Sequence, residues 1–192
     1  LAIRALCYFD LMQLYSKPYN MGSGSNGGVP LRLKAMKSAA ENDLAKSTVA
    51  EVYAQILKDL NDAEPLALSD YGNTHLNITR IHKNTIIALK TRVYLHMQNW
   101  ASVVTESAKI VPAAGAFTAT SGVAHTLNTS YSGLWTSPHN TKEHILSMPH
   151  TPGNNAGTQN HLAHYFGSGS GESYYLVSAP GSVYATMDAA DA

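Results

Sequence analysis

Apolar residues recur every three or four positions along much of the first 112 residues, which is the spacing of one face of an α-helix. Residues 84–111 show this most clearly and predict two helices that meet at a tight corner. Asn99 lies at that corner as a candidate N-cap, and Pro112 cannot continue the second helix. The faces predicted to point inward are Ile86, Leu89, Val93 and Met97 in the first helix and Ala101, Val104, Ala108 and Val111 in the second.

Two earlier helices are predicted from the same spacing. One covers roughly residues 5–15 and ends before Pro18. The other opens with Thr48 and Glu51, the spacing of a capping box, and ends at Pro65. The glycine-rich connection between these helices is longer than most loops in compact domains. The chain therefore contains two predicted helix–loop–helix units, which is the organisation of a helical repeat protein.

Helical spacing fades elsewhere in the chain. Residues 66–81 are predicted to be a polar loop, and residues 144–149 a short strand. We expect a mainly α fold of tetratricopeptide-like helix pairs, with long irregular loops and little strand. The chain is interpreted as one partial domain, residues 1–192. Its helical frame would be residues 1–112, and residues 113–192 would be loop-rich with the one strand.

Composition narrows the possible partners. Hydrophobic residues make up 44% of the chain, enough for a core, while charged residues make up only 14% and the net charge is zero. Without a basic patch to neutralise phosphates, nucleic acid is not expected to bind. A near-neutral surface rich in hydroxyls, amides and rings suits an uncharged ligand better. We expect no cofactor and no metal, because His161 and His164 have no third ligand at a telling spacing.

Two other side chains have simple structural interpretations. Cys7 is predicted to be a buried, inert thiol on an apolar helix face. Trp100 is predicted to pack between helices after the tight corner. No apolar run approaches the ~20 residues of a membrane-spanning helix.

Catalysis is not expected. The chain has no Gly-x-Ser-x-Gly nucleophile motif. Its second half also supplies few carboxylates for the opposed pair that a glycosidase needs. An esterase or glycosidase would require a nucleophile or a carboxylate pair gathered in a pocket by the fold.

The second half holds the candidates for binding sugar. Aromatic rings stack on the apolar face of a sugar, and amides and imidazoles can pair with its hydroxyls. The candidates are Tyr165, Tyr174, Tyr175, Asn160, His164 and Trp135. The alternative is structural, with the tyrosines anchoring the loop and the tryptophan in the core.

Several motifs, in order, resemble the SusD/RagB family. They lie at residues 4–19, 28–32, 48–63, 88–100 and 140–145. The resemblance thus spans about residues 4–146. His82 departs from it, since the family usually has a small capping hydroxyl at that place.

The resemblance implies an outer-membrane lipoprotein of Bacteroidetes that faces outward. Such proteins capture glycans or other nutrients, deliver them to a SusC-type TonB-dependent transporter, and have no catalytic activity. Family members are much longer, so we expect this chain to be a fragment lacking both ends. Membrane contact would then occur only through a lipid anchor absent from the fragment. The alternative function is a tetratricopeptide-like protein-interaction scaffold without its own sugar site.

Overall fold

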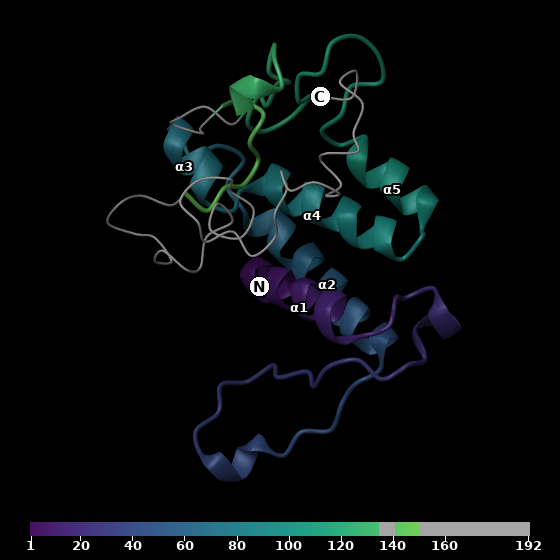
Figure 1. Ribbon diagram of the computed structural model, residues 1–192. Coiled ribbons are helices and arrows are strands. Elements are labelled where there is room, and N and C mark those ends of the chain that lie inside the picture. Colours follow the sequence, from purple (N-terminus) through teal and green to yellow (C-terminus); the bar gives the residue numbers. More distant parts are fainter. Residues whose placement is uncertain (135–140, 150–192) are drawn as a thin grey trace, which may run out of the picture. The chain divides into compact units, whose positions relative to one another are not determined.

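Two helix pairs form the frame of the protein (Figure 1). The computed structural model describes residues 1–134 and 141–149, and the chain divides into two compact units, Leu1–Ser147 and Met148–Ala192. The described helices are α1 (Ala2–Tyr15), α2 (Val49–Ala63), α3 (Thr74–Thr79), α4 (Lys83–His96) and α5 (Trp100–Ser107), with 3-10 turns η1 (Met21–Gly24), η2 (Ala39–Asn42), η3 (Glu64–Leu66) and η4 (Ser132–Leu134).

The predicted fold class is confirmed. α1 packs on α2, α4 packs on α5, and α2 also contacts α4. Within residues 1–134 and 141–149, β structure is limited to two isolated bridges, Gly27 with Thr48 and Thr118 with Thr126. The first unit is therefore a helical frame connected by irregular loops.

The helix starts predicted from the sequence are present. The Thr48 hydroxyl accepts from the Glu51 backbone N–H at 3.2 Å, and the Glu51 carboxylate accepts from the Thr48 N–H at 2.7 Å. The bond from the Thr48 N–H, and a second one of 2.9 Å that the Thr48 hydroxyl donates to the same carboxylate, hold the pKa of Glu51 below its ordinary value. At the corner before α5, the Asn99 side chain accepts from the Ser102 N–H at 3.2 Å.

The cap of α4 is an imidazole. Nδ1 of His82 accepts from the Asn84 N–H at 3.2 Å, and Thr85 Oγ1 accepts from the His82 N–H at 3.4 Å. His82 thus supplies the acceptor that a hydroxyl supplies at many helix starts. Because Nδ1 is an acceptor here, the neutral ring carries its proton on Nε2.

The core lies between α1, α2 and α4. Phe9 is fully buried and makes an edge-to-face contact with Tyr53, with ring centroids 6.4 Å apart. The buried apolar side chains of the cluster are Ala5, Tyr8, Phe9 and Met12 of α1; Val49, Val52, Tyr53, Ile56, Leu60 and Ala63 of α2; Ile86, Leu89 and Val93 of α4; and Val29. The inward face predicted for the first helix of residues 84–111 is therefore confirmed: Ile86, Leu89 and Val93 are buried, and Met97 is partly buried against the same core.

The connection between α1 and α2 is closed at its base. The Gly28 N–H donates to the Ser47 carbonyl at 2.7 Å, and the Ser47 N–H donates to the Val29 carbonyl at 3.3 Å. Gly28 has no room for a side chain, since a Cβ would lie 3.1 Å from the Ser47 oxygen and 3.2 Å from Met12 Cε. Beyond this base, residues 33–39 and 41–46 are exposed. We call residues 31–46 the arm. It includes η2 and is the dark blue loop below α1 and α2 in Figure 1.

Two secondary-structure predictions are wrong. The loop predicted at 66–81 contains α3, whose N-cap Asn73 accepts from the Leu76 N–H at 3.0 Å and which buries Ile78. Residues 144–149 have bent and irregular backbone instead of a strand. There the Ser147 N–H donates to the Ile78 carbonyl, at 2.8 Å, and so bonds to the end of a helix.

The inward face predicted for α5 is also wrong. Val104 is 67% exposed, and Ala101, Ala108 and Val111 are exposed too. The buried member of α5 is Glu106, whose charge is paired inside the frame.

Cys7 and Trp100 differ from their predictions as well. Both are exposed, Trp100 by 60% of its surface. The buried face of α1 consists of Ala5, Tyr8, Phe9 and Met12, which leaves Cys7 on the outer side of the helix.

Candidate functional site

The candidate sugar-binding residues from the sequence lie outside the described residues. They are Tyr165, Tyr174, Tyr175, Asn160, His164 and Trp135. His161, considered above for metal binding, lies there too. These assignments stay predictions.

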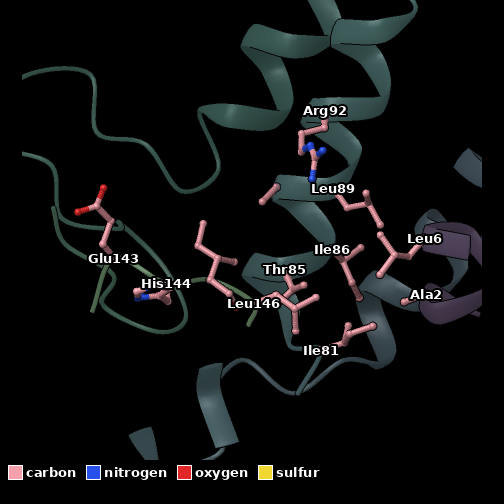
Figure 2. A pocket seen from close by; sticks show the side chains of 12 residues that line it. Ala2, Leu6, Ile81, Thr85, Ile86, Leu89, Arg92, Glu143, His144 and Leu146 are labelled. Carbon is pink, nitrogen blue, oxygen red and sulfur yellow. Dashed lines mark hydrogen bonds between the residues drawn. The ribbon is translucent and has the colours of Figure 1, made fainter. Parts of the chain in front are cut away.

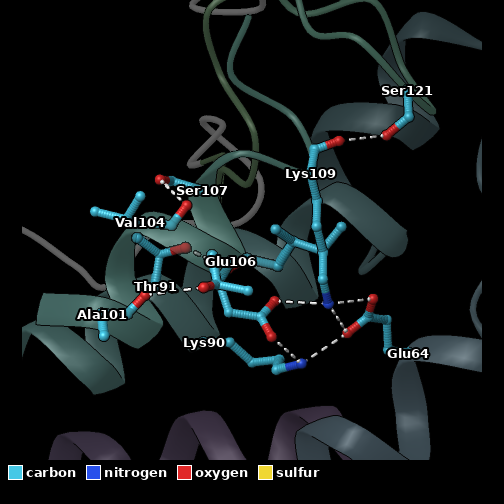
Figure 3. Close-up of polar contacts among 11 residues, drawn as sticks. Glu64, Lys90, Thr91, Ala101, Val104, Glu106, Ser107, Lys109 and Ser121 are labelled. Atoms are coloured by element: carbon cyan, nitrogen blue, oxygen red, sulfur yellow. Dashed lines mark hydrogen bonds and ion pairs between the residues drawn. The ribbon is translucent and has the colours of Figure 1, made fainter. Parts of the chain in front are cut away.

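A charge cluster joins the two helix pairs (Figure 3). Lys90 Nζ lies 2.8 Å from Glu64 and 2.7 Å from Glu106. Lys109 Nζ lies 3.0 Å from Glu64 and 2.8 Å from Glu106. Burial raises the pKa of Glu64, but bonds from both lysines outweigh it and hold that pKa below the ordinary value. All four groups are paired, so this charge cluster stabilises the frame and does not offer a catalytic acid or base.

An apolar cavity of about 370 Å³ opens between α1, α4 and residues 143–146 (Figure 2). Side chains such as Leu6, Ile86 and Leu89 form its floor, and Arg92 and Glu143 stand at its margins. Thr85 and His144 add polar groups to the lining, but aliphatic side chains predominate. The chemistry of the cavity suits an alkyl group or an apolar side chain.

A second cavity, of about 320 Å³, lies beside the C-terminal end of α1. We call it the aromatic cavity, because Tyr19, Tyr53 and His96 line it together with Gln13 and Lys17. The rings of Tyr19 and Tyr53 are 5.2 Å apart and inclined by 64°. This combination of ring surfaces with an amide and an ammonium group is one that can bind a polar ring compound.

Tyr53 has an unusual position in this cavity. Its side chain is only 4% exposed, and burial raises the pKa of its hydroxyl. None of the residues in the described part of the chain forms a hydrogen bond with that hydroxyl. The hydroxyl oxygen keeps some solvent-accessible surface, so water or a ligand in the cavity can pair with it.

A third cavity, of about 200 Å³, adjoins a pair of buried histidines. The rings of His82 and His125 stack at 5.3 Å with an interplanar angle of 18°. Nδ1 of His125 lies 3.0 Å from the Lys142 carbonyl, whereas Nε2 of each ring makes no hydrogen bond to a described residue. Burial lowers the pKa of both rings, and proximity to His125 lowers that of His82 further, against the opposing effects of nearby carbonyls and Asp70.

The histidine pair predicts a pH dependence of stability. The folded protein binds these protons less readily than the unfolded chain, whose histidines titrate near 6.5. The stability that the folded protein gains from keeping the two rings neutral is therefore fully present above about pH 6.5. It is lost as the pH falls through the folded pKa values. We expect the free energy of unfolding to decrease from about pH 7 to pH 5, by at most about 1.4 kcal/mol per pH unit for each ring. Asp59 and Glu64, whose pKa values are lowered, contribute only at more acidic pH.

His82→Asn tests this prediction, because asparagine keeps a cap acceptor and does not titrate. Urea unfolding should give a smaller decrease between the two pH values in this variant than in the wild type. His75→Asn, at an exposed position, serves as the control. An equal decrease in all three proteins would contradict the assignment.

No group of three or more histidine, cysteine or acidic side chains in residues 1–134 and 141–149 is arranged to hold a metal ion. None of the helices in this part of the chain is long and apolar enough to cross a membrane.

Comparisons with known proteins agree on one family. The family model SusD-like, described as "Starch-binding associating with outer membrane", matches residues 1–95. The crystal structure of a SusD superfamily protein from Bacteroides fragilis has a TM-score of 0.72 at 29% identity, over 85% of this chain. A SusD superfamily protein from Bacteroides thetaiotaomicron has a TM-score of 0.50 at 26% identity, over 56% of this chain. No curated protein matches the sequence.

The chain spans about a third of its relatives' length at most. The aligned part covers 35% of the Bacteroides fragilis protein and 22% of the Bacteroides thetaiotaomicron protein. The family model covers α1, α2 and nearly all of α4, and the shared fold extends beyond it. Residues 1–95 thus match the SusD-like family in sequence, and most of the chain shares the fold of a SusD superfamily protein.

Proposed function

We propose that the protein captures oligosaccharides at the outer cell surface and delivers them to a TonB-dependent transporter of the SusC type. The observation that carries the proposal is the match of residues 1–95 to a family described as starch-binding and associated with the outer membrane. The near-neutral composition is consistent with an uncharged ligand. In this proposal residues 1–112 are the frame, and the loops of residues 113–192 carry the sugar site suggested by the sequence.

A protein-interaction scaffold without a sugar site is the second candidate function. Exposed apolar side chains support it, among them Leu14 at 74%, Val104 at 67% and Trp100 at 60% exposure. Exposed apolar surface of this kind often marks contact with another protein. Such a scaffold would not bind oligosaccharides, so a binding assay distinguishes the two functions.

The assay is affinity electrophoresis or calorimetry of the full-length protein with starch oligosaccharides. The wild type should bind, and Tyr165→Ala and Tyr174→Ala should each weaken binding by about tenfold, which corresponds to the loss of one stacking ring. Tyr15→Ala removes a ring that is 71% exposed on α1 and should leave binding unchanged. Unchanged binding in the first two variants would remove those residues from the site, and a wild type without affinity for glycans would favour the scaffold.

Delivery requires a second measurement. A TonB-dependent transporter of the SusC type should co-purify with the full-length protein from outer membranes solubilised in mild detergent. Absence of a complex under these conditions would contradict delivery without affecting glycan capture.

A further inference from the structure

We propose that the aromatic cavity, lined by Gln13, Lys17, Tyr19, Tyr53 and His96, is a subsite for one sugar ring of the captured oligosaccharide. That the ligand is a sugar rests on the proposed function, whereas the position of the subsite follows from the side chains that line the cavity. This subsite is separate from the loop residues that the sequence suggested.

The cavity has the right size and surface for one ring. Its volume of about 320 Å³ is at the lower end of ligand pockets, which begin at about 300 Å³. Tyr19 and Tyr53 meet at 64°, so their rings form two inclined walls. Aromatic faces at such an angle can contact the apolar face of a sugar while its hydroxyls point toward polar groups.

The polar groups of the cavity have free hydrogen-bonding capacity. The Gln13 amide nitrogen donates to the Phe9 carbonyl at 3.3 Å, but its amide oxygen has no partner in the described part of the chain. Lys17 makes no ion pair with any described residue. A sugar hydroxyl both donates and accepts, so it can pair with an amide oxygen, an ammonium group or a phenol.

The Tyr53 hydroxyl is the observation that points most directly to a ligand. It belongs to a side chain that is 96% buried, as its 4% exposure implies, and it has no partner among the described residues although it adjoins a cavity. Packing explains the ring, which contacts Phe9 and Tyr19. Packing does not require the hydroxyl, which keeps accessible surface beside the cavity and is therefore available to a ligand.

The apolar cavity of Figure 2 is a weaker candidate for this role. It is somewhat larger, at about 370 Å³, but its floor is formed by aliphatic side chains such as Ile86 and Leu89. Its lining includes polar side chains such as Arg92 and Glu143 but neither tyrosine nor tryptophan, so it lacks the two inclined phenol rings of the aromatic cavity.

Tyr53→Phe tests the subsite without disturbing the core. The full-length variant should unfold at the same temperature as the wild type or slightly higher, because only an unpartnered hydroxyl is removed. Its affinity for maltoheptaose, measured by calorimetry, should fall by about three- to tenfold, the value of one hydrogen bond. Tyr19→Leu should weaken binding by about tenfold through the loss of a ring surface. Tyr15→Leu is the matched control, since this exposed tyrosine lies outside the cavity and should bind as the wild type does.

The outcomes separate the subsite from the proposed function. Reduced affinity in Tyr53→Phe and Tyr19→Leu, with unchanged thermal stability in the former, supports the subsite. Wild-type affinity in both variants, while Tyr165→Ala or Tyr174→Ala is impaired, overturns the subsite and leaves glycan capture standing. A wild type that does not bind maltoheptaose overturns the subsite together with starch-type glycan capture. A loss of thermal stability in Tyr53→Phe would show that the hydroxyl has a structural partner, which also overturns the inference.

Discussion

Replacing Lys90 with methionine is expected to lower the free energy of unfolding by about 3–5 kcal/mol. The Lys90 side chain is 4% exposed and lies between Glu64 and Glu106, at 2.8 and 2.7 Å. Without it, two nearly buried carboxylates would share a single lysine, Lys109, whose side chain is 37% exposed. Removing one partner of a buried ion pair leaves an uncompensated charge, which destabilises far more than the intact pair stabilises. Urea unfolding at neutral pH measures the difference.

Two further variants make this test specific. Lys58→Met removes the lysine of the exposed pair with Asp62, whose side chains are 65% and 46% exposed, and should change stability by less than about 1 kcal/mol. Lys90→Met combined with Glu106→Gln restores the charge balance and should recover part of the loss. If Lys90→Met destabilised the protein no more than Lys58→Met does, the charge cluster would not hold the helix pairs together.

Replacing Arg4 with methionine should lower the free energy of unfolding by about 3 kcal/mol. The Arg4 guanidinium donates two hydrogen bonds of 2.6 Å to Asp59, whose side chain is 1% exposed. Burial raises the pKa of Asp59, but the bonds from Arg4 and Gln55 outweigh it and hold that pKa below its ordinary value. In the variant, the carboxylate would remain buried with Gln55 as its remaining described partner, at 2.8 Å.

The loss of stability in Arg4→Met should depend on pH, and this dependence tests the role of Asp59. A lowered pKa of Asp59 stabilises the wild type above the unfolded value of 3.8, and this stabilisation is lost as the pH falls through the folded value. Without Arg4, burial dominates, so Asp59 is protonated more readily in the variant. The difference between variant and wild type should therefore be smaller at about pH 4 than at about pH 7. Arg80→Met, at an exposed position, should have little effect, and a pH-independent difference for Arg4→Met would contradict the role of Asp59.

The sequence predicts the helices well where local chemistry determines them. The capping box of Thr48 and Glu51 and the cap at Asn99 depend only on neighbouring residues, and both are present. Apolar spacing also identifies the buried face of α4, because Ile86, Leu89 and Val93 meet an apolar core. Family resemblance over the same segments agrees with the fold comparison.

The sequence-based predictions are wrong where a residue far away in the sequence determines which side chains are buried. α5 has an apolar stripe, yet Glu106 points inward because Lys90 and Lys109 neutralise it there. Lys90 belongs to another helix, so periodicity within α5 does not reveal this pairing. Trp100 is exposed for a related reason, since the corner at Asn99 fixes where α5 begins but not which side faces the core.

For the candidate sites too, the sequence indicates only what depends on residues that are close together in the chain. The sequence suggested aromatic residues in polar loops, all beyond the described residues. It did not suggest the aromatic cavity, because Gln13 and Tyr19 are brought to Tyr53 only when α1 packs on α2. The one local signal was Pro18-Tyr19 after the end of α1, which places a ring beside the helix terminus.

The arm has a consequence for how the frame is held together. It is exposed over residues 33–39 and 41–46, while α1 is fixed to α2 by the apolar core and by the bonds between Arg4 and Asp59. Covalent continuity through the arm therefore contributes little to the position of α1 beyond raising its local concentration. The chain could be opened there, and the piece containing α1 should reassociate with the remainder as a split protein. The arm is thus also a natural place to insert a reporter without disturbing the frame.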